Sequence, residues 1–236
     1  MTTATNAITE RPVEQQAIGQ IAVDLPGATA IFRRLKLDFC CGGQVPLAQA
    51  CASKGLDTQA VLAELAGLQR NDHAPDAQDP VALIDHILTR YHAVHREQLP
   101  ELIRMARRVE AVHRDHPAVP VGLAALLETM EVELLEHMEK EEQVLFPAIE
   151  NGAASLGEPI GAMRDEHTGH GALLEQLAAL TSDHTPPLGA CNTWRALYAG
   201  TAQLTDDLIS HIHLENNVLF PQSETAGGCG GACSCA

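Results

Sequence analysis

Two long stretches of the chain carry their core-facing residues at alternating steps of four and three. In the first stretch these positions are Leu123, Leu127, Met130, Leu134, His137, Glu141, Val144 and Ala148. In the second they are Trp194, Leu197, Thr201, Leu204, Leu208, His211, Glu215 and Val218. Steps of this size place side chains on one face of an α-helix, so each stretch is predicted to be a helix with this face toward a shared core.

Prolines mark where the long helices of this region begin. Pro80, Pro120, Pro159 and Pro187 each precede a helical pattern, and proline is favoured in the first turn of a helix. Residues 80–222 are therefore predicted to form four long helices. An up-down four-helix bundle buries one apolar face of each of them, so the chain is expected to be all-α.

The rest of the chain divides by composition. Residues 1–68 are predicted to form a small helical N-terminal domain, with a turn at Cys40-Cys41-Gly-Gly and a helix that Asp57 caps. Residues 69–79 are polar and are expected to be a linker. Residues 223–236 include a stretch rich in Gly and Cys and are expected to be a disordered tail, carrying Cys229, Cys233 and Cys235.

Charge and composition exclude several classes of function. The chain has 31 acidic and 15 basic residues, a formal net charge of −16, which argues against nucleic acid or an anionic membrane as a partner. No apolar run near the N-terminus resembles a signal peptide, and none elsewhere is long enough to cross a bilayer. Seven cysteines, an odd number, are a poor disulfide framework. We therefore expect a cytoplasmic protein.

The motif H-x3-E-x2-V-L-F-P occurs twice, beginning at His137 and at His211. In a helix, positions four apart lie on one face, so His137 stands beside Glu141 and His211 beside Glu215. These polar side chains interrupt the two apolar stripes at core positions, where unpaired polar groups are costly. A bound metal would compensate them, and helical bundles hold pairs of metal ions in this way.

The remaining ligands are expected from the first and third helices, at the height of the two motifs. His86 lies six residues after Pro80, as Glu141 lies six residues before a proline, so His86 is predicted to be level with it. His92 and His95 are expected roughly 9 and 14 Å further along and off the site. On the third helix the spacing leaves two candidates, His167 and His170, and height only weakly favours the former.

Four imidazoles and two carboxylates predict a dinuclear iron site. Ligands with nitrogen and oxygen but no thiolate suit iron or manganese, and imidazole-rich sites favour iron. We expect two iron ions with an oxo or hydroxo bridge, Glu141 and Glu215 as bridging carboxylates, and a position on each ion for O2 or nitric oxide. Glu133, one turn before His137, is a candidate for a supporting or proton-relaying residue. A single zinc ion would leave core ligands unused, and haem does not account for the paired glutamates.

Several motifs give the chain a specific resemblance. They are Asp38-Phe-Cys-Cys-Gly-Gly43, Ile84-Asp-His-Ile87, the stretch from Arg90 to Leu102, both H-x3-E motifs and Glu166-His167. In this order they resemble the Repair of Iron Centres family, di-iron proteins with a hemerythrin-like bundle. The resemblance favours His167 over His170. The tail with its three cysteines has no counterpart in the family pattern.

The resemblance implies a role in the response to nitrosative and oxidative stress, with nitric oxide and damaged iron–sulfur proteins as partners. It leaves open whether nitric oxide is reduced to nitrous oxide or only bound, and whether the protein is a homodimer. Cys40 and Cys41 are candidates for redox chemistry or iron transfer, since two adjacent cysteines before Gly-Gly exceed what a structural role needs. The competing hypothesis is a hemerythrin-like module that binds or senses O2. A carboxylate-rich oxygenase or ferroxidase fits the excess of histidine less well.

Overall fold

The computed structural model describes residues 12–25, 28–68, 79–153 and 155–226. Every named element of secondary structure in these ranges is a helix, so the predicted all-α class is confirmed. Contacts divide the chain into two units, Met1–Ala74 and Pro75–Ala236. The division falls inside the predicted linker, of which residues 69–78 lie outside the described ranges. None of the described helices is long and apolar enough to cross a membrane.

The described part of the first unit contains a 3₁₀ turn and four short helices. The turn is η1 (Val13–Gln15), and the helices are α1 (Ile18–Asp24), α2 (Ala28–Arg34), α3 (Leu47–Ser53) and α4 (Thr58–Ala66). The rings of Phe32 and Phe39 lie 5.9 Å apart in its core. The Asp57 side chain accepts a hydrogen bond from the Gln59 amide at 2.9 Å, so Asp57 caps α4 as predicted.

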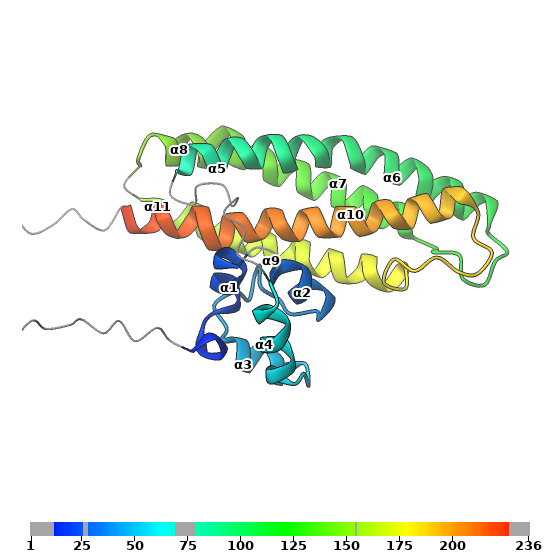
Figure 1. Ribbon diagram of the computed structural model, residues 1–236. Coiled ribbons are helices and arrows are strands. Elements are labelled where there is room, and N and C mark those ends of the chain that lie inside the picture. Colours follow the sequence, from blue (N-terminus) through cyan, green and yellow to red (C-terminus); the bar gives the residue numbers. More distant parts are fainter. Residues whose placement is uncertain (1–11, 26–27, 69–78, 154, 227–236) are drawn as a thin grey trace, which may run out of the picture. The chain divides into compact units, whose positions relative to one another are not determined.

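The second unit is a bundle of four helical rods (Figure 1). The first rod is α5 (Pro80–Ile87), η2 (Leu88–His92) and α6 (Ala93–Val112), and the second is α7 (Leu123–Lys140), η3 (Glu141–Leu145) and α8 (Phe146–Glu150). The third is α9 (Gly157–Leu180), and the fourth is α10 (Asn192–Leu214), η4 (Glu215–Leu219) and α11 (Phe220–Ala226). α6 packs against α7 and α10, and α9 packs against the same two helices, which closes the ring of four.

Three of the rods contain a π-helical turn. These turns are η2, η3 and η4, and the last two start at the glutamates of the repeated motifs. In each motif the proline follows the π turn by two residues, and proline cannot donate the usual helical hydrogen bond. The backbone is therefore not purely α-helical at Glu141 and Glu215. π-helical turns of this kind are frequent at functional sites.

The fourth rod continues past the predicted end of the bundle. The sequence placed residues 223–236 in a disordered tail, but α11 extends to Ala226. Ser223 Oγ donates to the Leu219 carbonyl at 3.2 Å, and Arg164 of α9 pairs with Glu224 at 2.7 Å, so these polar side chains have partners within the helix and on the neighbouring rod. The tail cysteines Cys229, Cys233 and Cys235 lie outside the described residues.

Because the interior of the bundle is buried, shortening a core side chain should lower the free energy of unfolding. Leu204 on α10 is fully buried, so Leu204→Ala should lower the free energy of unfolding by about 2–5 kcal/mol through lost contacts and a cavity. The matched control is Leu188→Ala, because Leu188 is fully exposed. Chemical denaturation of both variants measures the difference, and equal stabilities would contradict the packing described for α10.

Candidate metal centre

Six buried side chains form two groups of four in the core of the bundle. The first group is His92, Glu141, His211 and Glu215, and the second is His137, Glu141, His167 and Glu215. Within each group the candidate ligand atoms all lie within 4.8 Å of one another. The two glutamates belong to both groups, so each could contact two metal ions.

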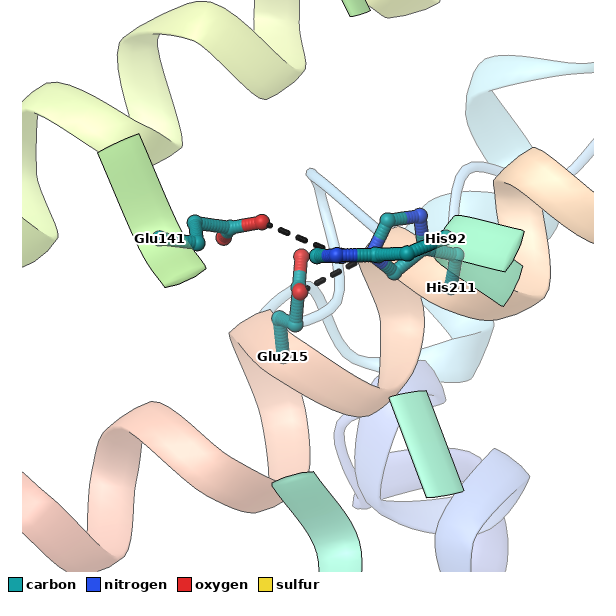
Figure 2. Close-up of side chains that lie close together, drawn as sticks. All are labelled: His92, Glu141, His211 and Glu215. Carbon is teal, nitrogen blue, oxygen red and sulfur yellow. Dashed lines mark hydrogen bonds and ion pairs between the residues drawn. The ribbon is translucent and has the colours of Figure 1, made fainter. Parts of the chain in front are cut away.

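In the first group, the candidate ligand atoms of two glutamates and two histidines point toward one another (Figure 2). His92 Nε2 lies 3.1 Å from His211 Nε2. His211 Nε2 lies 2.9 Å from Glu215 Oε1, and His92 Nε2 lies 3.4 Å from Glu141 Oε2. These donors come from η2, η3, α10 and η4, so three rods of the bundle build the group.

The second group repeats the same arrangement with the other two imidazoles. His137 Nε2 lies 3.1 Å from His167 Nε2. His167 Nε2 lies 3.0 Å from Glu215 Oε2, and His137 Nε2 lies 3.4 Å from Glu141 Oε2. Glu215 thus directs one oxygen to each group, which is the disposition of a bridging carboxylate.

The donor set fits bound cations. Both oxygens of Glu141 and Oε2 of Glu215 are buried and make no well-formed hydrogen bond in the described structure, although imidazole nitrogens lie 3.0–3.4 Å from the two Oε2 atoms. Burial and the neighbouring charge of Glu215 raise the pKa of Glu141 well above its usual value. Burial opposes ionisation of Glu215 as well, but His211 and His167 hold the pKa of Glu215 well below its usual value. Positive ions between the carboxylates would remove this conflict.

His137 is held in the neutral form that binds metals. Burial, followed by the charge of His167, lowers the pKa of His137 to about 3. A histidine with this pKa keeps a free lone pair at neutral pH, so no proton has to leave before a metal binds. Nitrogen and oxygen donors without thiolate favour iron or manganese among the common metals.

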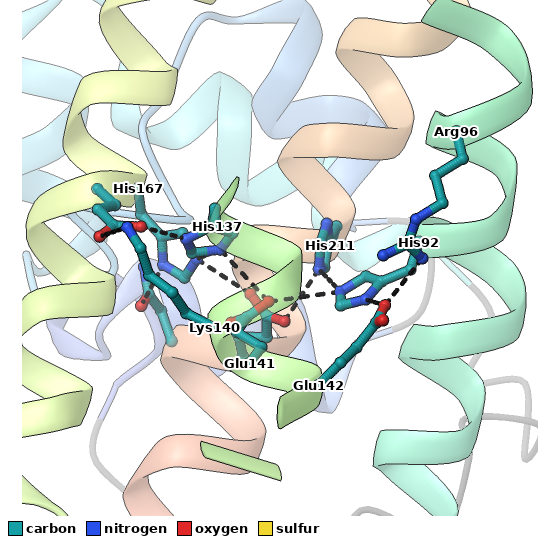
Figure 3. A network of polar contacts seen from close by, with 11 residues as sticks. His92, Arg96, His137, Lys140, Glu141, Glu142, His167 and His211 are labelled. Atoms are coloured by element: carbon teal, nitrogen blue, oxygen red, sulfur yellow. Dashed lines mark hydrogen bonds and ion pairs between the residues drawn. The ribbon is translucent and has the colours of Figure 1, made fainter. Parts of the chain in front are cut away.

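A second layer of polar groups orients two of the candidate ligand rings from outside (Figure 3). His92 Nδ1 lies 2.7 Å from Glu142 Oε1, and Arg96 pairs with Glu142 at 2.8 Å. On the other side of the centre, His137 Nδ1 lies 2.9 Å from Glu166 Oε2. A carboxylate on Nδ1 holds the proton there and leaves Nε2 as the donor atom for the metal.

Further partners complete this layer. Lys140 Nζ donates to Glu166 Oε1 at 2.7 Å, which matches the pairing of Arg96 with Glu142 in the first group. His167 Nδ1 lies 2.9 Å from Asn216 Oδ1. Two of the four ring orientations therefore depend on a carboxylate that is itself paired with a cationic side chain.

The structure does not bring His86 into either group, and His92 stands in the position expected for it. His86 is only partly buried, and its ring contacts that of Tyr91 at 5.7 Å between centroids. The predicted height assumed that the second helix ends near Pro147, whereas α8 continues to Glu150. The π turn η2 further changes the spacing along the first rod. Both effects move the matching position beyond His86.

Glu133 is also not where the sequence analysis placed it. Its side chain is exposed, whereas Glu166 makes the contact with His137. Each step of four residues rotates a helical position by about 40°, so Glu133 turns away from the face that Glu141 occupies. The pair Glu166-His167 in the sequence was the available sign of this residue, since it places a carboxylate next to a candidate ligand.

Cys40 and Cys41 belong to the first unit and form a separate cluster with Asp38. The two Sγ atoms lie 3.8 Å apart, and Asp38 accepts hydrogen bonds from the amides of Cys41 and Gly42, each at 2.9 Å. The hydrogen bond with Cys41 and burial raise the pKa of Cys40, which keeps it a thiol. Cys41 is exposed and is the more accessible of the two sulfurs.

Comparisons with known proteins agree with this geometry. Residues 83–223 match the Hemerythrin HHE cation binding domain, and residues 14–69 match a domain of unknown function named ScdA_N. The chain is 50% identical over 212 residues to the iron-sulfur cluster repair protein YtfE of Citrobacter koseri, covering 88% of this chain and 96% of that protein. YtfE of Escherichia coli O157:H7 and of Shigella boydii gives the same values. The chain therefore belongs to the hemerythrin-like family of iron–sulfur cluster repair proteins.

Proposed function

We propose that the protein holds two iron ions and uses them to bind nitric oxide and to support the repair of damaged iron–sulfur clusters. The observation that carries the proposal is the pair of ligand groups that share Glu141 and Glu215. His92 and His211 would hold one ion, and His137 and His167 the other. This ligand set keeps five of the residues predicted from the sequence and replaces His86 with His92.

Two ions explain the geometry better than one. A single zinc ion in either group would leave two imidazoles of the other group facing each other at 3.1 Å without a cation between them. Two ions, each with two imidazoles and a share of both carboxylates, use all six side chains. Iron supplies the redox-active character that reversible binding of nitric oxide requires.

The chain's own residues control what happens at the centre. All six proposed ligands are at most 1% exposed, so bulk water is kept from the ions. Glu142 and Glu166 hold protons on Nδ1 of the rings that they contact, and Glu166 could exchange a proton with solvent because its side chain is 30% exposed. These groups would support proton movement if nitric oxide were reduced to nitrous oxide, and they would only orient ligands if it were bound without turnover.

A repair function is supported by the family and by the first unit. The YtfE relatives are iron-sulfur cluster repair proteins, so damaged iron–sulfur proteins are the proposed partners and the cytoplasm the proposed location. The Cys40–Cys41 cluster could pass iron or electrons to such a partner, because Cys41 is exposed. A hemerythrin-like O2 module remains the second candidate, but it gives these cysteines no role.

The proposed ligand set predicts different iron contents after substitution of His92 and of His86, two histidines of the first rod. His92→Ala should lower the iron content, because it removes a buried ligand of one ion. His86→Ala is the matched control and should keep about two iron ions per chain. Elemental analysis of the purified variants measures the difference, with circular dichroism to show that both remain helical. Loss of iron from the control alone would restore His86 as the ligand and exclude His92.

Nitric oxide binding follows from the proposed ligand count, which leaves room on each ion for a small molecule. The reduced protein should bind nitric oxide stoichiometrically under anaerobic conditions and develop new visible absorption bands. Gas analysis for nitrous oxide after the titration separates reduction from binding. An unchanged spectrum with nitric oxide, together with reversible O2 binding, would favour the O2 module.

The cysteine cluster predicts a separation of iron binding from repair. The double substitution Cys40→Ser and Cys41→Ser should leave the iron content and nitric oxide binding unchanged, because both residues belong to the first unit. It should abolish reactivation of a damaged iron–sulfur enzyme. The control is Cys191→Ser, which alters an exposed thiol of the second unit. Full reactivation by the double variant would show that the pair has no part in repair.

A further inference from the structure

Two additional histidines lie in the core beside the proposed ligands. His95 follows His92 by three residues on the first rod, and His170 follows His167 by three residues on α9. His95 is 0% and His170 4% exposed. Because the spacing is the same on both rods, the two extra imidazoles extend the site in a matching way.

Each extra ring contacts a ligand ring of a different group. The centroids of His95 and His211 lie 5.5 Å apart, and those of His170 and His137 lie 4.9 Å apart. Neither extra histidine belongs to the sets whose donor atoms lie within 4.8 Å of one another. The two residues therefore border the metal centre without being among its ligands.

The direction of the helices places both residues on the side opposite the carboxylates. On the second and fourth rods, Glu141 and Glu215 follow their histidines by four residues toward the C-terminal ends. The first and third rods run in the opposite direction (Figure 1). His95 and His170 follow their neighbours by three residues, so they stand about 4.5 Å beyond them, away from the carboxylates.

Three of the four nitrogen atoms of these rings have no hydrogen-bond partner in the described structure. Nδ1 and Nε2 of His95 and Nδ1 of His170 are buried without a hydrogen-bond partner in the described structure. A neutral imidazole always carries one N–H, so His95 holds an unsatisfied donor whichever tautomer it adopts. Leaving a buried donor unpaired costs free energy, and native structures avoid this unless a ligand supplies the acceptor.

His184, a half-buried histidine in the turn after α9, has different surroundings. Its Nδ1 lies 3.0 Å from Thr201 Oγ1, and its Nε2 lies 3.3 Å from Thr205 Oγ1. Both of its nitrogens thus have protein partners. The orphaned nitrogens of His95 and His170 stand in contrast to this pairing and lie beside the proposed metal centre.

We propose that His95 and His170 donate hydrogen bonds to a small anion bound at the metal centre on the face opposite Glu141 and Glu215. The ligand class is a compact acceptor of two or three atoms with negative charge, and a larger organic anion is not expected in a core this closely packed. This inference rests on the proposed pair of iron ions. It adds to the site two residues that would position a bound molecule and set its orientation.

Azide tests the inference without requiring reactivity toward nitric oxide. The oxidised, iron-loaded full chain is titrated with azide and followed by visible absorption. His95→Phe and His170→Phe should each weaken azide binding about 10-fold, the effect of losing one hydrogen bond to a charged group. His95→Gln keeps an amide donor and should recover part of the affinity. His184→Gln is the control, with unchanged azide binding expected.

Iron content and the spectrum without azide are measured for every variant. Unchanged azide affinity in both Phe variants would overturn the inference, as would the absence of azide binding by the unaltered chain. Loss of iron, or a changed spectrum before azide is added, would overturn it in another way, because the residues would then be metal ligands. If the unaltered chain itself lacks the pair of iron ions, the proposed function fails and the inference fails with it.

Discussion

The bundle depends on the meeting of two carboxylates, Glu141 and Glu215, in its core. Each is fully buried, and the charge of one raises the pKa of the other. Two such groups side by side would destabilise a helical bundle unless cations or protons compensated them. The four imidazoles around them lie with Nε2 atoms facing inward, so the surrounding residues are arranged for cations. The energetics of the core thus favour cations between these carboxylates.

The backbone around these carboxylates departs from regular α-helix in a consistent way. Glu141 and Glu215 each begin a π turn that a Phe-Pro pair follows. Because the proline cannot supply its helical hydrogen bond, the helix has a weakened position near the site in both halves. Phe220 stacks on His167, with ring centroids 6.0 Å apart, and Phe146 stacks on His92 at 5.8 Å. The Phe-Pro pair that both motifs share therefore also orients the imidazole rings of His167 and His92.

The sequence was sufficient for the fold class and for placing the four polar side chains of the repeated motifs together in the core. The pairs His137–Glu141 and His211–Glu215 needed only the periodicity of a single helix, and periodicity is local. Matching His92 to them required the relative height of two helices, which depends on where the helices end and on the π turn at residues 88–92. Neither feature has a reliable signal in one sequence, and the prediction of His86 was displaced by more than a turn. Glu133 lies two steps of four residues before Glu141, and the accumulated rotation of about 80° places its side chain at the surface.

Mössbauer spectroscopy of the iron-57-loaded full chain tests the central claim most directly, because it reports the number of iron environments and the coupling between them. Two ions bridged by Glu141 and Glu215 should be magnetically coupled in the oxidised state. Such a coupled pair should give quadrupole doublets without magnetic splitting at low temperature, with about two iron ions per chain. A magnetically split spectrum from isolated ferric ions, or a stoichiometry of one ion per chain, would contradict it.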